Sequence, residues 1–213
     1  GNEPNRYLGD KVAAAGDVNK DGCNDIIASW GGTYYNPQYH GIYLGSPSGP
    51  ATSPIWTSLV PYEGSVSTAG DVNCDGFNDI IVGEPELGYY DRGRVLVYLG
   101  SPTGVVSTPA WTIESDHTRA GFGRAAVAAG DVNGDGCGDV AVGAPSYNYG
   151  TAGYLFTYLG SPQGLSTIPE WTAYRLAGGD GFGSTASTAG DVNGDGNDDL
   201  LGAHPRESYF DGE

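Results

Sequence analysis

An acidic nine-residue pattern that occurs four times constrains the fold of this chain more than any other feature. The pattern is Asp-x-Asn-x-Asp-Gly-x-x-Asp, and its copies begin at Asp17, Asp71, Asp131 and Asp191. Successive copies are 54 to 60 residues apart. Repetition at a nearly fixed period of this length indicates a repeat architecture in which each period folds as one supersecondary unit.

Four short strand-like runs accompany each full period. In the first period they cover residues 11–18 before the acidic loop, and then 25–30, 40–49 and 54–57 after it. Apolar runs of this length between Gly and Pro turns predict β-strands. Four strands in each period are typical of a β-propeller blade, and the radial repetition of blades limits exposed sheet edges. We therefore expect an all-β fold, a β-propeller of four-stranded blades.

One tryptophan marks the fourth run of each full period. These residues are Trp56, Trp111 and Trp171. A large ring at the same place in every repeat is expected in the core between neighbouring blades, where it buries much apolar surface, rather than on a ligand platform.

The last period is shorter than the others, because the chain stops where its third strand would begin. A two-stranded hairpin is marginally stable and leaves an open edge that invites pairing. We expect residues beyond 213, or another chain, to complete the ring, and the start at Gly1 without Met suggests an excised or processed piece. The expected units of this single propeller domain are blade 1 at residues 1–60, blade 2 at 61–115, blade 3 at 116–175 and half of blade 4 at 176–213.

The formal charge of −17 is concentrated in the repeated loops, whose positions 1, 5 and 9 alone hold 12 of the 26 acidic residues. Four divalent cations, one in each loop, would move that charge to −9. A chain this acidic is a poor binder of nucleic acid or of anionic membranes. The sequence has no apolar run long enough to span a membrane and no recognisable signal peptide.

The repeated loop has the ligand chemistry of a calcium site. Calcium takes six to eight oxygen ligands from carboxylates, amide oxygens and backbone carbonyls. Positions 1, 3, 5 and 9 offer side-chain oxygens, position 7 a backbone carbonyl, and Gly at position 6 a tight turn. About four calcium ions, one in each repeat, are therefore expected. The candidate ligands are Asp17, Asn19, Asp21, Cys23 and Asp25; Asp71, Asn73, Asp75, Phe77 and Asp79; Asp131, Asn133, Asp135, Cys137 and Asp139; and Asp191, Asn193, Asp195, Asn197 and Asp199.

Other metal loops fit the pattern less well. A helical calcium loop needs a carboxylate at position 12, where this chain has Ala28, Val82, Val142 and Gly202. Magnesium keeps several waters and is rarely caged by so many protein oxygens. Zinc prefers His and Cys, which are not clustered here. Because three carboxylates in one loop repel one another, we expect calcium to stabilise the folded hairpins.

The three cysteines all lie inside acidic loops. Their odd number leaves at least one thiol unpaired within the chain. Cys23 and Cys74 belong to consecutive repeats, so a disulfide between them is one possibility. The alternative that the sequence favours is that the cysteines are small, buried free thiols.

The loops between the second and third strands vary from repeat to repeat and are rich in tyrosine. In a propeller blade they lie on the face opposite the acidic loops, and variable loops on a repeated scaffold are common sites of recognition. Packing between blades is an equally good explanation for these rings. The candidate ligand-binding residues are Tyr34, Tyr35, Tyr89, Tyr90, Tyr147 and Tyr149.

Together these features resemble FG-GAP repeats, the units of the integrin alpha-subunit β-propeller. Phe122-Gly123 and Phe182-Gly183 correspond to the FG element, and Gly143-Ala144-Pro145 corresponds to the GAP element. The resemblance implies a seven-bladed extracellular propeller, with calcium hairpins on the lower face and ligand recognition on the upper face. The first two repeats depart from it, with Leu8-Gly9, Ser29-Trp30, Glu63-Gly64 and Gly83-Glu84-Pro85 at these places.

The function expected from these features is a non-catalytic binding or adhesion module, secreted or at the cell surface, for a protein or carbohydrate ligand. The alternative is a structural subunit of a surface fibre or layer that assembles through the incomplete blade. An enzyme is not expected, because no motif places a Ser or Cys nucleophile with a histidine. The histidines fall at unrelated places in the repeat, at His40, His117 and His204.

Overall fold

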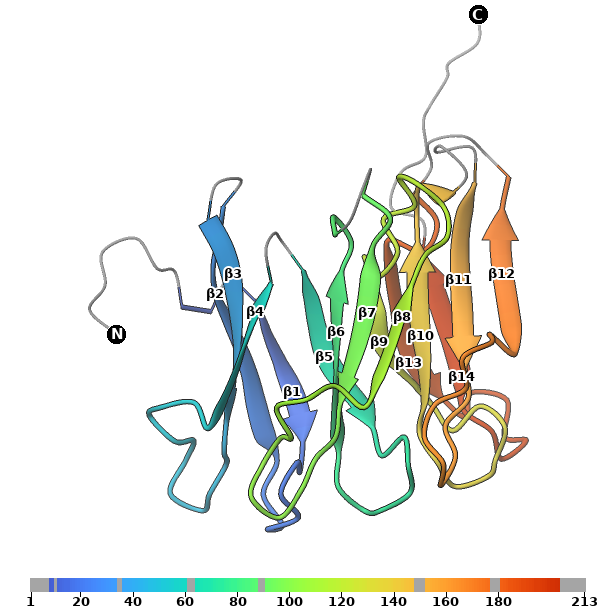
Figure 1. The fold of residues 1–213 in the computed structure, drawn as a ribbon. Helices are drawn as coiled ribbons and strands as arrows, with labels where there is room; N and C mark the ends of the chain where they lie inside the picture. The colour runs from blue at the N-terminus through green and yellow to red at the C-terminus, as the bar shows by residue number, and fades with distance from the viewer. Residues whose placement is uncertain are drawn as a thin grey trace, which may run out of the picture.

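The computed structural model describes residues 8–9, 11–33, 36–60, 64–87, 91–147, 152–176 and 181–203. Their strands form four antiparallel sheets in chain order (Figure 1). The first sheet contains β1 (Val12–Gly16), β2 (Asp25–Thr33), β3 (Asn36–Tyr43) and β4 (Trp56–Val60). The second contains β5 (Ser65–Gly70), β6 (Asp79–Glu84), β7 (Arg94–Tyr98) and β8 (Trp111–Glu114). The third contains β9 (Ala126–Gly130), β10 (Asp139–Ala144), β11 (Gly153–Tyr158) and β12 (Trp171–Arg175), and the fourth β13 (Thr185–Gly190) and β14 (Asp199–Ala203).

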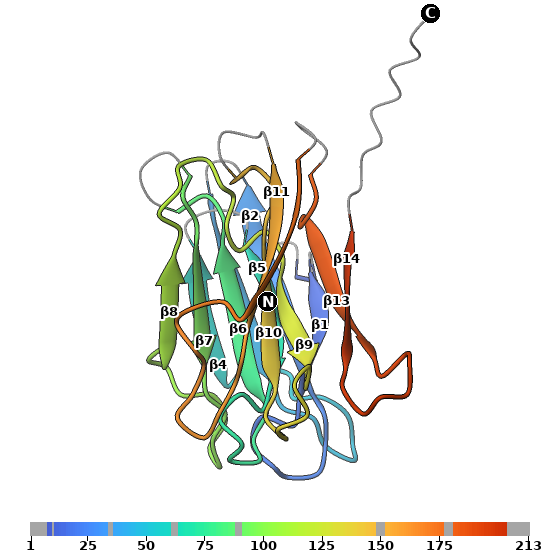
Figure 2. The same ribbon diagram turned by 90° about the vertical axis from the view of Figure 1, so that its right-hand side faces the viewer.

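The sheets stand side by side as the blades of a propeller do. Each four-stranded sheet keeps its strands in sequence order. The first strand of each sheet neighbours the first strand of the next, from β1 to β5, β9 and β13 (Figure 1). Figure 2 looks along this row of sheets. This arrangement confirms the expected all-β fold of four-stranded propeller blades.

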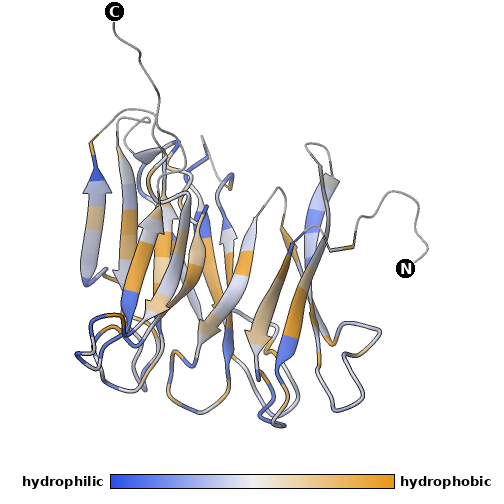
Figure 3. Ribbon diagram, turned by 180° about the vertical axis from the view of Figure 1, so that it is seen from behind, coloured by the Kyte–Doolittle hydropathy of each residue, from blue (hydrophilic) through white to orange (hydrophobic). Residues whose placement is uncertain are grey.

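Apolar side chains fill the space between successive sheets. Figure 3 marks apolar residues along the strands of these sheets. All six residues of β6 are buried, because this strand lies in the second sheet with a neighbouring sheet on each side. Ile80 and Val82 pack toward the first sheet, whereas Ile81 packs toward the third. Successive strand residues point to opposite faces, so the apolar run of a middle strand supplies both cores.

A repeated tryptophan lies in the core between two blades wherever the next blade has a third strand to pack against it. Trp56 packs edge-on against Tyr98 with ring centroids 4.9 Å apart, and Trp111 packs in the same way against Tyr158 at 5.2 Å. The expectation of a buried ring is wrong for Trp171, which is 54% exposed. In the part of the chain that the structure describes, no strand follows β14 to cover that ring.

The two kinds of loop lie at opposite ends of the blades. The acidic loops and the turns that follow the third strands lie at the lower end in Figure 1, and β2, β6 and β10 end at the upper end. The second strands therefore end opposite the acidic loops, as the sequence predicts. Among the described residues there is no helix long and apolar enough to cross a membrane.

Candidate metal site in the acidic loops

Each acidic loop is folded around its own carboxylates. In the first loop, the Asp17 carboxylate accepts hydrogen bonds from the backbone N–H groups of Asp21 at 3.0 Å and Gly22 at 2.8 Å. The Asp21 carboxylate accepts one from the Cys23 N–H at 2.9 Å, and Asn19 Nδ2 donates to it at 2.9 Å. The loop thus gathers the side chains of positions 1, 3 and 5 at one turn.

The same network recurs in the other three loops. The first carboxylate of each accepts the N–H of position 5 at 3.0 to 3.1 Å and that of position 6 at 2.7 to 3.0 Å. The glycine at position 6 has φ between 88° and 93° in all four loops, a backbone region that side chains with a Cβ atom rarely adopt. The repeated sequence therefore specifies one repeated loop geometry.

The carboxylate at position 9 connects the loop to the end of the third strand. Asp79 accepts the N–H of Val72 at 2.9 Å and that of Gly100 at 2.8 Å, and its side chain is fully buried. Asp25 and Asp139 make the matching pair of bonds in their own blades. Sequence reasoning missed the glycine partner, although its recurrence in every Leu-Gly-Ser-Pro turn was the available signal.

Burial of these carboxylates makes their negative charge costly. Burial raises the pKa of Asp79 to about 7 and that of Asp139 to about 6. The backbone hydrogen bonds oppose the shift, whereas the nearby charges of Asp75 and Asp71 add to it for Asp79. Burial also raises the pKa of Asp25. The groups that act on these carboxyls include acids but no cation, so a bound cation would favour their ionised form.

The donor set fits a hard cation, although the side chains do not surround one common point. Within the described ranges, no three His, Cys, Asp or Glu side chains are gathered closely enough to hold an ion as they stand. Their oxygens instead accept backbone N–H groups, and each carboxylate oxygen keeps further lone pairs for a metal. Hard oxygen donors suit calcium better than zinc. The assignment of each ligand residue therefore stays a prediction.

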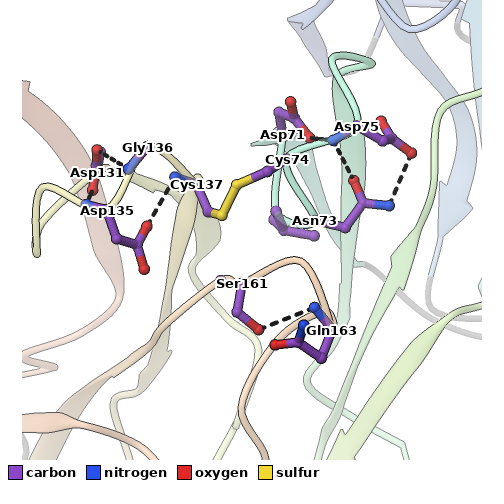
Figure 4. Close-up of a disulfide and its surroundings, with 12 residues drawn as sticks. Asp71, Asn73, Cys74, Asp75, Asp131, Asp135, Gly136, Cys137, Ser161 and Gln163 are labelled. Atoms are coloured by element: carbon purple, nitrogen blue, oxygen red, sulfur yellow. Dashed lines mark hydrogen bonds between the residues drawn. A yellow bond between two sulfur atoms is a disulfide. The ribbon is translucent and has the colours of Figure 1, made fainter.

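Consecutive loops contact one another through fixed positions. Position 4 of one loop faces position 7 of the next loop. Lys20 Nζ lies 5.4 Å from the centre of the Phe77 ring. Cys74 forms a disulfide with Cys137, with Cα atoms 5.0 Å apart (Figure 4). At the next step, a Cβ atom on Gly134 would lie 2.6 Å from Asn197 Oδ1.

This geometry corrects the prediction for the cysteines. A bond between Cys23 and Cys74 is excluded by the pairing of Cys74 with Cys137, and free thiols were the wrong expectation for those two residues. Cys23 is free. Cys23 occupies position 7, which faces the preceding loop, so the first loop meets the second through Lys20 instead. The spacing of the cysteines could not show this direction of contact.

The tyrosine-rich loops are mostly outside the described residues. This applies to Tyr34, Tyr35, Tyr89, Tyr90 and Tyr149.

Tyr147 is described, and it packs rather than projecting freely. Its ring centroid is 4.1 Å from that of His117 and 4.4 Å from that of Tyr154. Burial, followed by the nearby Asp116 charge, raises the pKa of Tyr147 to about 12. These contacts favour a packing role for this ring.

A serine and a histidine do meet in the first blade, but in its interior. Ser29 Oγ and His40 Nδ1 are 2.7 Å apart, and both side chains are 0% exposed. Burial, together with the charge of Lys11, lowers the pKa of His40 to about 4. A substrate cannot reach this pair, so its hydrogen bond is part of the packing between blades.

Comparison with known proteins agrees with this architecture. A family model described as FG-GAP repeat matches residues 64–98 and 122–157. Mouse integrin alpha-8 is 30% identical over 210 residues, which are 92% of this chain and 19% of that protein. Drosophila melanogaster integrin alpha-PS2 is 38% identical over 121 residues, covering 51% of this chain and 8% of that protein.

Two of the proteins similar to this chain are named as enzymes. Mouse phosphatidylinositol-glycan-specific phospholipase D is 35% identical over 174 residues, covering 74% of this chain and 20% of that protein. Among solved structures, Bacillus licheniformis rhamnogalacturonan lyase PL11 has a TM-score of 0.60 at 17% identity and covers 93% of this chain and 41% of that chain. This structural likeness shows the fold alone.

The chain spans a fifth or less of the length of these three curated relatives. The matched repeats contain the acidic loops of the second and third blades, and the relatives extend the match over most of the sequence. The chain therefore belongs to the FG-GAP repeat proteins and is similar to the integrin alpha subunits.

Proposed function

We propose that this chain is part of a calcium-binding FG-GAP propeller that serves as a non-catalytic binding or adhesion module, secreted or at the cell surface. The observation that carries the proposal is the fourfold loop whose described carboxylates accept hydrogen bonds from backbone and amide N–H groups, with the position-9 carboxylate buried in the first three blades. The similarity to integrin alpha subunits supports an adhesion-type role for the module. The expected divisions at residues 60, 115 and 175 are proposed as its blade boundaries.

Calcium would be held by the side chains at positions 1, 3, 5 and 9 and by the carbonyl at position 7 of each loop. The ion supplies positive charge where the loops concentrate acids. The chain's own contribution is to hold those groups in a fixed turn through Gly at position 6 and through the Asp at position 9, which is buried in the first three loops. Because unfolded chain lacks this arrangement, calcium should stabilise the folded state by linkage.

Calorimetric titration and thermal unfolding test the metal. We expect about one calcium bound in each intact loop, and a melting temperature that falls when a chelator is added. Asp71→Asn with Asp75→Asn should remove one site, whereas Asp116→Asn, an exposed acid outside the loops, should remove none. An unchanged melting temperature with chelator, or equal stoichiometry in the two variants, would exclude the proposed role of calcium.

The tyrosine-rich upper loops are the proposed ligand-binding face, with a protein or carbohydrate as partner. Tyrosine suits such surfaces because its rigid ring gives apolar contact and its hydroxyl gives a hydrogen bond. Glycan arrays and pull-down assays should show binding that Tyr89→Ala with Tyr90→Ala removes. Trp171→Ala is the control, since this ring is 54% exposed at the start of β12, the end of that strand opposite the upper loops. Binding that survives the first change and not the second contradicts the assignment.

The alternative is a structural subunit of a surface fibre or layer. Apolar side chains are exposed on the last strands of the described chain, with Trp171 at 54% and Leu201 at 61%. Another chain could cover them and complete the ring. Light scattering with calcium present separates the two functions, because a strict monomer of 22.0 kDa excludes assembly through this edge.

The non-catalytic part of the proposal rests on the burial of the Ser29 and His40 pair and on the hydrogen bonds that hold the loop carboxylates. The names of the phospholipase and the lyase describe those proteins. Hydrolysis of a phosphatidylinositol-glycan by this chain, lost on Ser29→Ala, would overturn this part of the proposal.

A further inference from the structure

A pocket opens between the second and third blades on the lower face. Its volume is about 290 Å³. Apolar side chains of both blades line it, with two amides beside them, and these include Val97, Leu99, Trp111, Leu165, Asn73 and Gln163. Figure 4 shows both amides, Asn73 and Gln163, near the disulfide between the second and third acidic loops. The pocket is thus lined by apolar side chains and by polar groups in nearly equal measure.

At the junction between blades 1 and 2, a side chain of the protein itself fills the position that corresponds to this pocket. Ile55 and Ala110 occupy the same place before the fourth strand of their blades, because the N–H of each donates to the third strand at 2.8 Å. Ile55 Cδ1 lies 3.2 Å from the point where a Cβ atom on Gly104 would stand. The first blade therefore covers the turn of the second blade with an isoleucine.

At the pocket the corresponding cover is missing. Gly164 is the counterpart of Gly104, and no heavy atom lies within 4 Å of the point where its Cβ would stand. Ala110 and Gly164 both line the pocket. Gly104 is buried, whereas Gly164 is only partly covered. The change from isoleucine to alanine between the two blades thus leaves an opening of the shape that a branched aliphatic side chain fills.

The surroundings of the opening favour positive charge in an occupant. Asn73 lines the pocket and belongs to the second acidic loop, whose three carboxylates keep a net charge of −1 with one divalent cation bound. The chain as a whole carries −17, and four divalent ions would still leave it at −9. Negative charges on an occupant would be repelled near the opening, and positive charges would be attracted.

We propose that this pocket binds a partner polypeptide through one branched aliphatic side chain flanked by lysine or arginine. The aliphatic group takes the place that Ile55 fills in the preceding junction and packs over Trp111 and Leu165. The flanking cations face the acidic loop. This site lies on the lower face, apart from the upper loops proposed for adhesion.

Peptide titration followed by ¹⁵N-¹H NMR tests the pocket. The probes are acetyl-Lys-Ile-Lys-amide, acetyl-Lys-Ala-Lys-amide and acetyl-Glu-Ile-Glu-amide. The first should give saturable shifts at the Gly164 N–H and the Trp111 indole N–H. The alanine peptide should bind about tenfold more weakly, because it lacks most of the buried apolar surface. The glutamate peptide should also bind more weakly, because its charges are repelled. Equal binding of all three peptides, or shifts that never saturate, would overturn the proposal.

Two variants of the protein sharpen the test. Ala110→Ile should fill the opening and weaken the first peptide at least tenfold. Ile55→Ala should create a second opening, seen as new peptide-dependent shifts at the Gly104 N–H. Ile55 is 47% exposed, so the fold should tolerate this change. If Ala110→Ile does not fold, the second variant decides alone, and absence of the new shifts contradicts the proposal.

Discussion

The junction between blades 1 and 2 and the junction between blades 2 and 3 have the same backbone plan but different chemistry. In the upper part of the second junction, the Phe122 side chain is 3% exposed, and its backbone lies against Gly93 so closely that no Cβ would fit there. The first junction has polar residues at the matching places. Gln38 Oε1 accepts the Gly64 N–H at 2.9 Å, and His40 replaces an apolar strand residue.

The lower parts of the two junctions also differ in the kind of contact that joins the blades. Lys20 reaches the second loop by a contact with the Phe77 ring and a weak 3.4 Å hydrogen bond to the Asp75 carbonyl. One junction further on, a covalent bond joins Cys74 to Cys137. The comparison teaches that the repeated sequence determines the structure of the blade and of its acidic loop. The side chains that join neighbouring blades differ from one junction to the next.

The largest expected effect is the loss of the apolar contact in the second junction. Phe122→Ala should lower the free energy of unfolding by about 3–5 kcal/mol, because it removes a buried ring and leaves a cavity. Urea denaturation measures it. Phe182→Ala is the matched control, since Phe182 has the same place in the next repeat but is only partly buried. An equal loss in both variants would show that the burial of Phe122 is not what distinguishes its junction.

Removal of the disulfide should have the next largest effect. Cys74→Ser with Cys137→Ser opens a covalent loop that spans 63 residues of sequence and should cost about 2–4 kcal/mol. Cys23→Ser should cost much less, because Cys23 is free. Mass spectrometry without reductant should find the 74–137 pair. A reductant that leaves the denaturation midpoint unchanged would contradict this prediction.

The polar junction should be sensitive to acid. The imidazole of unfolded chain takes up a proton below about pH 6.5, whereas buried His40 stays neutral down to about pH 4. The protein therefore takes up a proton when it unfolds between about pH 6.5 and pH 4. The free energy of unfolding should fall as pH decreases through this range, by up to about 3 kcal/mol.

Replacing the polar pair by the residues of the second blade isolates this contribution. Ser29→Gly with His40→Val copies Gly83 and Val95, which occupy the same strand places. Unfolding curves from pH 7 to pH 4 should show a smaller loss for the double variant than for the unchanged protein. The charge of Lys11 stays in both proteins, so a difference reports on the imidazole. Parallel curves would mean that other groups cause the loss.

Much of the blade could be predicted from sequence, because period and apolar alternation are local properties of the chain. The strands, the loop position and the opposite placement of the two loop kinds all follow from them. The disulfide could not be predicted, since it depends on which loop position faces the next blade. The bond from Gly100 to Asp79 was missed for a similar reason, because it joins a turn to a loop 21 residues away.

The smallest expected effect belongs to Lys20, and it measures how much the first junction gains from its non-covalent contact. Lys20→Ala should lower the free energy of unfolding by less than about 1 kcal/mol, because exposed cation–π contacts contribute about 0.5–1 kcal/mol. Lys20→Met keeps most of the apolar stem and removes the charge. If the contact is electrostatic, both variants should lose a similar amount in urea denaturation. A loss of unfolding free energy confined to Lys20→Ala would assign the contact to the apolar stem instead. A loss as large as that expected for removal of the disulfide would show that the two junctions are held equally strongly.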